Sequence, residues 1–458
     1  MRYVHLLTTL TLGVGMVFSA AGADGLGLDP FSTRDSVKPY TPCVAESNTA
    51  PLGLTQVVDI ALCANPQTRL AWANARVQAA ALGVAEAAWL PTVNANISSG
   101  KNRSYGVTSN QRTTSVSASW LLFDFGARSG TIENARQLLE AAAATQDATI
   151  QSVFLSAVQD FYQTQSAEAS LAAAVEAEKA AELSFKAADA KYKVGSAAPA
   201  DKLQAQTAYS QAQLTRITAE GALKTAQGTL AAIMGRDAHR TVTLVAAEQT
   251  LPMDFERDVD TLINDARRQR PDLLAAQAQV KAAEASVDAA RAAHLPTLSL
   301  GVTESDQKLG SVDNHGGTLG LTLSVPLFTG FATTYKVQSA EALREAKQAQ
   351  AEALRLQVAQ DVWNAWQSLL TATQTVRTTA DLIASAEQSD KVARGRYGAG
   401  VGTLLEMLNA QSALASARQQ RVQALYNWNI ARATLAQAMG VLDTNSIATP
   451  GTREGHQQ

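Results

Sequence analysis

The stretch from residue 90 to residue 126 reads LPTVNANISSGKNRSYGVTSNQRTTSVSASWLLFDFG, and a second copy of it follows at residues 295–331. The second copy reads LPTLSLGVTESDQKLGSVDNHGGTLGLTLSVPLFTGF. The two are offset by 205 positions (295 minus 90), and the offset is the same at both ends of the stretch. A repeat of this kind is established first, because missing it leads to the wrong fold.

Both copies alternate apolar and polar residues, which is typical of strands with one apolar and one polar face. The apolar positions of the first copy are Val93, Ala95, Ile97, Val116, Ala118, Trp120 and Leu122. Those of the second copy are Leu298, Leu300, Val302, Leu321, Leu323, Val325 and Leu327. Polar, glycine-containing stretches at 100–112 and 305–317 separate the alternating segments, and we expect them to be loops. The sequence therefore predicts β-hairpins over 92–123 and 297–328.

The same offset extends far beyond the hairpins. Asn65-Pro66 matches Arg270-Pro271, and Met234-Gly235 matches Met439-Gly440. Residues 54–235 and 270–440 are therefore two copies of one unit. The intervening residues 236–269 are an equatorial linker that we expect to form a small belt of sheet and helix. Residues 441–458 are polar, and we expect a flexible tail.

A very long helix is predicted after each hairpin. Residues 127–193 contain no proline and only Gly130 as a glycine, and a helix over them would be about 100 Å long. A turn follows, and Pro199 begins a second helix that ends near residue 235. The second unit repeats this order, with a long helix from residue 332 to the turn at 397–403 and a last helix that ends near residue 440.

The N-terminal residues predict export from the cytoplasm. Residues 1–23 have the features of a signal peptide, with Arg2 before an apolar run and Ala21-Gly22-Ala23 as a cleavage site. The alternative is an uncleaved membrane anchor. Residues 24–53 contain four prolines and no periodicity, so we expect an extended periplasmic arm. A disulfide between Cys43 and Cys63, the only two cysteines, would hold this arm; two free thiols are the alternative.

Four strands with an apolar face limit what the chain can do alone. Closing a sheet into a barrel takes about eight strands, so one copy of this chain cannot form one. About nine residues of alternation in each strand suit the roughly 9 to 11 that cross a bilayer at a tilt. These features favour an outer-membrane barrel shared among protomers. A soluble β-sandwich hairpin on a helical protein is the alternative.

The sequence offers little for an enzyme. Its five histidines are scattered, and no metal-binding spacing, Walker loop or nucleophile elbow is found, so we expect no cofactor. The glycine-rich residues 398–402 follow a helix rather than a strand, which suits a turn between helices. The 38 Lys and Arg residues are balanced by 41 Asp and Glu residues, so no nucleic-acid partner is indicated. Transport by this chain would be passive.

These residues together resemble the TolC family of outer-membrane efflux proteins. The resemblance rests on the duplicated unit, the Leu-Pro-Thr strand entries, the LFDFG corner at 122–126, the YKVG turn at 192–195 and the IMG and AMG helix ends. It covers residues 54–440 and implies a homotrimer with a 12-stranded transmembrane β-barrel, four strands from each protomer. A periplasmic tunnel of long α-helices, an α-barrel, would continue it. Residues 61–67 (ALCANPQ), with Cys43, are similar to the CyaE-like type I secretion branch.

The resemblance also implies where the functional residues lie. It places Tyr192, Gly195, Ser196, Tyr397, Gly400, Gly402 and Thr403 at the periplasmic tip, where an adaptor docks. Glu406 matches the first acidic position of a ring at the pore entrance, and Asn409 stands at the second, so one acidic ring is expected. Asp201 matches a residue that helps to latch the closed tip. The alternative for Glu406 and Asp201 is an ordinary solvated helix face.

The implied function is that of an outer-membrane channel-tunnel in a tripartite export system, a passive exit duct for type I protein secretion. The implied partners are two further copies of the chain, a periplasmic adaptor (membrane fusion protein), an inner-membrane ABC transporter or proton-driven pump, and outer-membrane lipid. A drug or metal efflux duct of the same family is one alternative. A periplasmic coiled-coil adaptor or scaffold is another, although adaptors do not repeat strand hairpins between helices.

Overall fold

The computed structural model describes residues 29–38, 51–240, 242–245 and 258–442. The helices of the first repeat are η1 (Thr33–Ser36), α2 (Leu54–Ala64), α3 (Pro66–Glu86), η2 (Ala87–Trp89), α4 (Ala127–Lys193) and α5 (Pro199–Ile233). Those that follow are α6 (Val259–Gln269), α7 (Pro271–Ala292), α8 (Ala332–Gly398) and α9 (Leu404–Ala438). The strands are β1 (Thr92–Ser104), β2 (Val107–Phe123), β3 (Thr297–Leu309) and β4 (Val312–Ser324). The helix-rich fold with one small sheet agrees with the sequence prediction.

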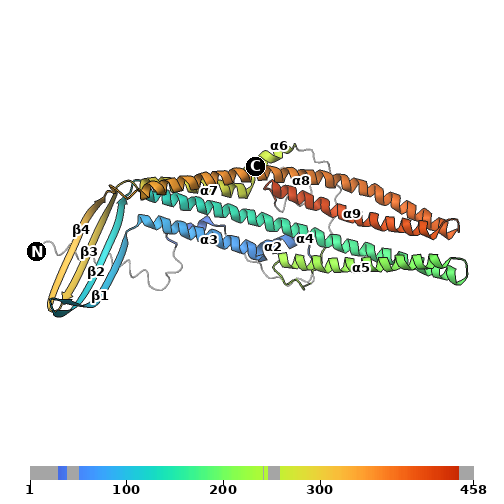
Figure 1. The fold of residues 1–458 in the computed structure, drawn as a ribbon, viewed down its shortest axis with the longest axis horizontal. Coiled ribbons are helices and arrows are strands. Elements are labelled where there is room, and N and C mark those ends of the chain that lie inside the picture. Colours follow the sequence, from blue (N-terminus) through green and yellow to red (C-terminus); the bar gives the residue numbers. More distant parts are fainter. Residues whose placement is uncertain (1–28, 39–50, 241, 246–257, 443–458) are drawn as a thin grey trace, which may run out of the picture. The chain divides into compact units, whose positions relative to one another are not determined.

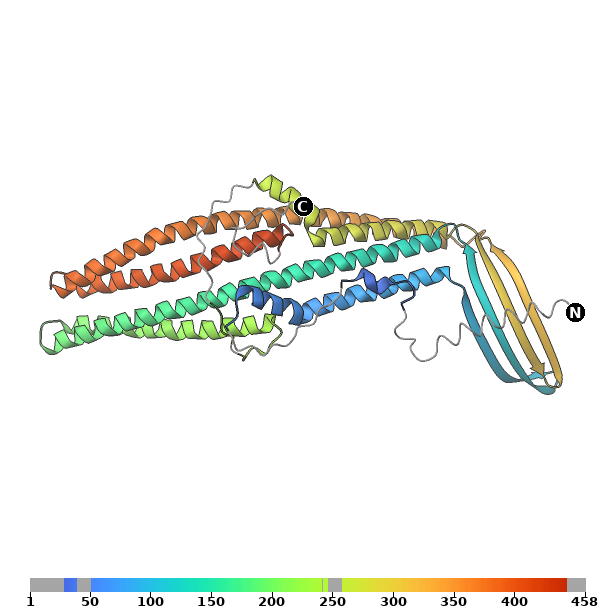
Figure 2. The same ribbon diagram turned by 180° about the vertical axis from the view of Figure 1, so that it is seen from behind.

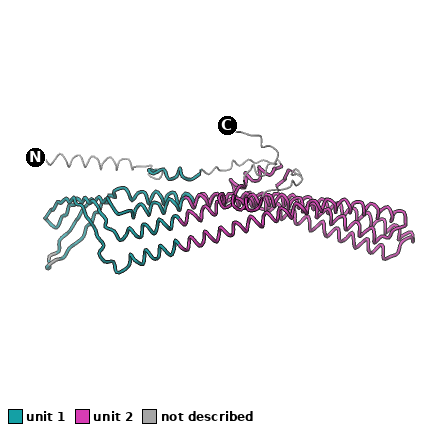
Figure 3. Tube along the Cα trace, turned by 90° about the horizontal axis from the view of Figure 1, so that it is seen from above, with its two compact units in different colours: residues 1–39, 75–139, 281–344 teal, residues 40–74, 140–280, 345–458 magenta. Residues whose placement is uncertain are grey.

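The chain divides into two compact units, coloured separately in Figure 3. The described part of the first unit includes residues 75–139 and 281–344 and holds the sheet. The second unit includes residues 140–240 and 345–442 and holds both helix turns. The long helices α4 and α8 contribute residues to both units.

The first unit is built around one antiparallel sheet with the strand order β1-β2-β3-β4 (Figure 1). The pairing of β1 with β2 and that of β3 with β4 are in equivalent register: Val93 pairs with Ala118, and Leu298 pairs with Leu323. The central pair, β2 with β3, joins the two repeats and brings Trp120 opposite Leu300. Each repeat thus supplies one hairpin to a shared sheet.

The prediction of long loops inside the hairpins is wrong. Pairing continues to Ser104 with Val107 and to Leu309 with Val312, so each hairpin closes through a two-residue turn. Tyr105 and Gly106 form the first turn with φ of 50° and 79°, as two-residue hairpins of type I′ require. Alternation of polarity marks only the part of a strand that has one apolar face, so it stops before the pairing does.

The second hairpin also ends earlier than predicted, at Ser324 rather than at residue 328. Pro326 lies two residues further on, and proline has no backbone N–H to donate to a neighbouring strand. The equivalent position of β2 is Leu121, where the pairing with β3 shifts register between Leu121 and Phe123. Both repeats therefore leave regular pairing at the same place, one by a bulge and one by a proline.

A sharp corner connects each hairpin to its long helix. In the first repeat Phe125 and Gly126 have φ of 53° and 98°, and in the second Gly330 and Phe331 both have φ of 63°. Two consecutive left-handed residues reverse the chain direction, and each corner forces one phenylalanine into a conformation that normally favours glycine. Within the first unit, α4 then packs closely on α7, because a Cβ on Gly130 would lie 2.8 Å from the Ala289 nitrogen.

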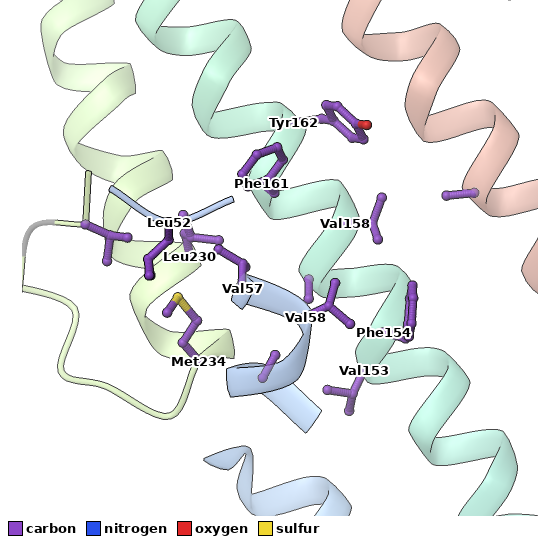
Figure 4. Close-up of a cluster of buried hydrophobic side chains, with 14 of the residues drawn as sticks. Leu52, Val57, Val58, Val153, Phe154, Val158, Phe161, Tyr162, Leu230 and Met234 are labelled. Atoms are coloured by element: carbon purple, nitrogen blue, oxygen red, sulfur yellow. The ribbon is translucent and has the colours of Figure 1, made fainter. Parts of the chain in front are cut away.

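In the second unit each long helix pairs with the shorter helix that follows it. Figure 2 shows α5 beside α4 and α9 beside α8. Two hydrophobic cores hold these pairs, and they use equivalent positions of the repeat. Val57, Val153 and Leu230 of the first core (Figure 4) correspond to Leu262, Val358 and Leu435 of the second. The predicted duplication thus extends to the buried side chains.

The linker and arm are described only in part. The linker contains α6, as expected, but the only strand-like pairing in its described residues is an isolated parallel bridge between Leu52 and Leu244. The described part of the expected arm contains η1, which the sequence did not predict. The predicted signal peptide (1–23), Cys43 and residues 443–458 of the predicted tail lie outside the described residues.

Candidate pore entrance and membrane sheet

The turn between α4 and α5 has the geometry of a Schellman motif. Gly195 has a φ of 74°, its N–H donates to the Tyr192 carbonyl at 2.9 Å, and the Ser196 N–H donates to the Lys191 carbonyl at 2.8 Å. These bonds satisfy carbonyls at the end of the helix. The Ser196 hydroxyl also donates to the Lys191 carbonyl, at 3.0 Å. Gly195 and Ser196 therefore have a demonstrable role in forming the turn.

The turn between α8 and α9 repeats this motif. Gly400 has a φ of 76°, its N–H donates to the Tyr397 carbonyl at 3.2 Å, and the Val401 N–H donates to the Arg396 carbonyl at 3.0 Å. A Cβ on Gly402 would lie 2.9 Å from the Arg396 Cβ, so this position requires glycine. The Thr403 hydroxyl accepts a hydrogen bond from the Glu406 N–H at 3.2 Å and caps α9.

The ends of the two helix pairs contact each other within the second unit. A small apolar cluster joins Ala188 and Ala205 of the first pair to Leu404 and Met407 of the second. Beside it, the Lys191 ammonium lies 3.9 Å from the centre of the Tyr397 ring, close enough for a cation–π interaction. The structure thus brings the predicted residue Tyr397 to the first helix pair, whereas Tyr192 contacts Lys202 of its own pair at 5.4 Å.

The ion pairs of the first turn form at Asp189, a residue that the sequence did not single out. Its carboxylate lies 2.7 Å from the Lys193 ammonium and 2.8 Å from that of Lys202. Hydrogen bonds from these two lysines hold the pKa of Asp189 below its ordinary value. Among the described residues, Lys193 and Lys202 pair with Asp189 and not with Asp201. The spacing of Asp189 and Lys193, four residues apart on one helix, was the available signal.

Glu406 and Asn409 are both exposed and lie three residues apart near the start of α9. This spacing places them on one helix face. The Glu406 carboxylate lies 3.9 Å from the Arg396 guanidinium, and both side chains are about half exposed. An exposed pair at this distance contributes little to stability. The Glu406 carboxylate is therefore accessible in the single chain.

The sheet exposes an apolar face. Leu319, Leu321 and Leu323 of the edge strand β4 are 73%, 66% and 65% exposed, and Ile97 of β1 is 71% exposed. The pairing places them on the same face as Trp120, whose indole N–H donates to the Trp89 carbonyl at 2.9 Å. A surface of this kind marks a membrane or protein contact. β1 and β4 form the two edges of the sheet.

Cys63 of α2 is disulfide-bonded. Cys43 lies outside the described residues, so its pairing with Cys63 stays a prediction. Across the described ranges, no α-helix has an apolar stretch of the length and hydropathy needed to cross a membrane. The same ranges contain no cluster of three or more His, Cys, Asp or Glu side chains that could hold a metal ion.

Known proteins are similar to this chain in sequence and in fold. The sequence is 31% identical to protein CyaE of Bordetella pertussis over 453 residues, which cover 96% of each chain. It is 22% identical to the outer membrane protein TolC of Escherichia coli, over 86% of this chain and 83% of TolC. The fold superposes on a crystal structure of a membrane protein from Pseudomonas aeruginosa with a TM-score of 0.77, at 22% identity, covering 88% of this chain and 99% of that one.

The family described as outer membrane efflux protein matches this chain twice, at residues 57–236 and 262–441. The two matches coincide with the two repeats seen in the sequence and in the two cores. They confirm the expected relationship to TolC, and they favour an export duct over the coiled-coil scaffold that the sequence alone left open. The chain belongs to the outer membrane efflux protein family.

Proposed function

We propose that this chain is the outer-membrane channel-tunnel of a tripartite export system and serves as a passive exit duct for type I protein secretion. The observation that carries the proposal is the four-stranded sheet, which exposes an apolar face and has two edges with unused hydrogen-bonding groups. Three copies paired edge to edge would close a barrel of twelve strands, because β1 of one copy can pair with β4 of the next. The apolar face would then contact outer-membrane lipid.

The helix turns supply the periplasmic end of the proposed duct. Three copies would bring three Glu406 carboxylates around one axis, with Asn409 one turn further along. Converging carboxylates repel each other and attract cations, so we propose a single acidic ring at the entrance. The adaptor would dock on the turns at 192–196 and 397–403, and an inner-membrane transporter would supply the energy. Similarity to CyaE over 96% of each chain favours the type I secretion branch, with an ABC transporter as that partner.

Planar-bilayer recording tests the channel and its entrance together. The protein would be purified from outer membranes in detergent, and its trimeric state checked before insertion. Discrete cation-selective openings are expected, with weaker selectivity for Glu406→Ala. Glu352→Ala, an exposed glutamate in the middle of α8, is the matched control and should leave selectivity unchanged. Equal selectivity in all three proteins would refute the acidic ring. A wild-type protein that stays monomeric and does not associate with membranes would refute the barrel.

The cargo needs a separate test. Deleting the gene should stop secretion of a protein that carries a C-terminal type I export signal, while drug and metal tolerance stay unchanged. Loss of tolerance with normal secretion would instead assign the duct to small-molecule efflux within the same family.

A further inference from the structure

All charged side chains of the sheet lie on one of its two faces. The four strands contain eight ionisable side chains: Lys101, Arg103, Arg112, Glu304, Asp306, Lys308, Asp313 and His315. The strand pairing connects them in rows, since Arg112 pairs with Lys308, and Lys308 pairs with Asp313. These rows continue the face that carries the apolar row of Val302 and Leu319, because every second residue of a strand points to the same side.

The opposite face of the sheet carries no ionisable side chain. It consists mainly of Asn, Ser, Thr, Gln and Gly residues along the full length of the four strands. If the part of the sheet beyond the apolar rows simply extended into water, both faces would be hydrated equally and charges would suit either one. All ionisable side chains lie on the face that carries the apolar rows. This indicates that only this face meets a charged environment.

The two hairpins contribute different charges to this face. In the hairpin of β3 and β4 the positive charge of Lys308 is neutralised, because its ammonium group lies 3.3 Å from the Asp313 carboxylate. The hairpin of β1 and β2 has three cations, Lys101, Arg103 and Arg112, and no acidic residue. All three are exposed, and none forms an ion pair among the described residues. The unbalanced positive charge is therefore confined to the first hairpin.

The height of Arg112 fits the headgroup region of a bilayer, and Lys101 and Arg103 lie beyond it on the same face of the sheet. Ile97 is the last apolar residue of β1, and Arg112 pairs with Ser99, two residues beyond it. At about 3.3 Å per residue, Arg112, Lys101 and Arg103 lie roughly 7, 13 and 20 Å further along the strand. A strand tilt of about 40° reduces these distances to roughly 5, 10 and 15 Å along the membrane normal. The headgroup region adds roughly 5 to 8 Å to each side of the hydrocarbon core.

We propose that Lys101, Arg103 and Arg112 form a binding surface for phosphorylated lipid headgroups in the leaflet that the hairpin turns reach. This inference rests on the proposed barrel, which places the apolar face against lipid. Guanidinium groups bind phosphate oxygens through two parallel hydrogen bonds, and lysine adds a third positive charge. Since no carboxylate forms an ion pair with these cations among the described residues of the chain, anionic headgroups are a complementary partner. A diphosphorylated glycolipid of the lipid A type has the required chemistry.

The test counts lipids bound to the purified protein in detergent by native mass spectrometry. The probes are diphosphoryl lipid A and the same glycolipid without its phosphates. The variant Lys101→Gln/Arg103→Gln/Arg112→Gln removes the three cations. The control Lys179→Gln/Lys186→Gln/Lys224→Gln removes three exposed lysines from the helices and changes the net charge equally.

Wild-type and control proteins should bind diphosphoryl lipid A at least roughly tenfold more tightly than the sheet variant. The phosphate-free glycolipid should bind all three alike. Equal binding of the diphosphoryl lipid to the sheet variant and the control would overturn the proposal. Millimolar inorganic phosphate should not displace the lipid; full displacement would assign the cations to free phosphate instead.

Bilayer conductance of the same samples separates this proposal from the proposed function. The sheet variant should still form trimers and conduct, because its substitutions change side chains only and leave the backbone hydrogen-bonding groups of the edge strands and the entrance residues unaltered. Retained conductance with unchanged lipid binding would refute the lipid surface alone. Loss of trimers in the wild-type protein would refute the barrel itself and, with it, the lipid surface.

Discussion

The two repeats form the same backbone with different chemistry at two of its critical points. At the start of the long helix, the first repeat has a buried ion pair between Asp124 and Arg128, at 3.1 Å. The second repeat has Thr329 and Thr333 at these positions, and their exposed hydroxyl groups share a hydrogen bond of 2.9 Å. One corner is thus held by two buried charges and the other by two neutral groups.

The junction between the short helices shows the reverse arrangement. In the first repeat the neutral Asn65 side chain donates to the Ile233 carbonyl at 3.0 Å and accepts from the Gln67 N–H at 2.8 Å. In the second repeat the Arg270 guanidinium lies 2.6 Å from Asp272 and 2.7 Å from Asp361. Burial lowers the pKa of Arg270, but the two carboxylates outweigh this effect and raise it.

Both junctions nevertheless have the same close packing. A Cβ on Gly235 would lie 2.6 Å from the Ala64 carbonyl oxygen, and one on Gly440 would lie 2.9 Å from the Arg270 Cα. Both glycines have a positive φ, 68° and 76°, and both close a Schellman motif at the end of their helix. The backbone is therefore set by glycine, proline and apolar positions, while the polar groups that satisfy it can change. Exchanging these polar groups between repeats tests this conclusion.

The largest effect is expected at the corner of the first repeat. Arg128 donates to the Leu121 carbonyl at 2.6 Å and lies over the Trp89 ring at 4.2 Å, in addition to its pair with Asp124. Arg128→Thr would leave the buried Asp124 carboxylate without a counter-charge. Removing one partner of a buried pair costs about 3–5 kcal/mol, so a clear drop in the urea midpoint of unfolding is expected.

The double exchange Asp124→Thr/Arg128→Thr supplies the control, because it transplants the chemistry of the second corner. It should recover part of the lost stability, since no unpaired charge remains. Thr333→Val in the second corner removes an exposed hydrogen bond and should change stability by less than about 1 kcal/mol. If the single and double variants unfolded at the same urea concentration, the carboxylate would not be the source of the loss.

A somewhat smaller effect is expected at the junction of the second repeat. Arg270→Asn would leave Asp272 and Asp361 unpaired, but both carboxylates remain about one-third exposed. The cost should therefore be about 2–3 kcal/mol, below that of a fully buried pair. Thermal unfolding followed by circular dichroism in detergent measures it, with Asn65→Ala, which loses two hydrogen bonds, as a comparison at about 1–2 kcal/mol.

The matching transplant is Arg270→Asn/Asp272→Gln/Asp361→Ser, which copies Asn65, Gln67 and Ser156 of the first repeat. It should be more stable than Arg270→Asn alone, because it removes both orphaned carboxylates. A triple variant that is less stable than the single one would show that the junctions are not interchangeable, and that the second repeat needs its charges.

A third difference between the repeats is expected to depend on pH. Burial raises the pKa of Asp160 to about 6, and the equivalent residue of the second repeat is the buried Ala365. The protonated carboxyl group contributes to stability in full below pH 3.8, its ordinary pKa. This contribution is lost as the pH rises through about 6, because the buried group must then ionise. Asp160→Ala should stabilise the protein at pH 8 by about 1 kcal/mol, a value reduced for partial exposure.

Unfolding of wild-type and Asp160→Ala proteins between pH 4 and pH 8 checks this sign. The gain should be largest at pH 8 and should vanish or reverse near pH 4. Asp147→Ala removes another aspartate of α4 and is the control for the loss of one negative charge from this helix. A gain that did not change with pH would contradict the assignment to the buried charge.

The elements of this fold follow from the sequence more readily than its polar contacts. Proline and glycine mark the ends of the helices, and alternation marks the apolar part of each strand, so both repeats were predictable. The ends of β1 and β2 near their turn, from Gly100 to Gln111, have polar residues on both faces and no alternation, so the sequence does not predict the full length of the strands. Arg270 and Asp361 are 91 positions apart, and nothing in the sequence indicates that two helices bring them together. The resemblance points to Asp201 at the start of α5, whereas only the four-residue spacing from Lys193 marks Asp189 in the sequence.

The smallest effect is expected where the two helix pairs meet. The equivalent residues Lys191 and Arg396 have different partners, since Lys191 lies over the Tyr397 ring while Arg396 faces Glu406. Lys191→Met would remove a partly exposed cation–π interaction of about 0.5–1 kcal/mol. In the proposed channel this contact joins the two tips of one protomer, so its loss should raise the rate of spontaneous opening about two- to fivefold in bilayer recordings. Lys191→Arg keeps a cation over the ring and should behave as the wild type.

Lys193→Met is the second control, because it affects only the pair with Asp189 in the first turn. Faster opening in Lys193→Met but not in Lys191→Met would show that the pair with Asp189, and not the contact with Tyr397, restrains the tip. The two turns would then act independently of each other.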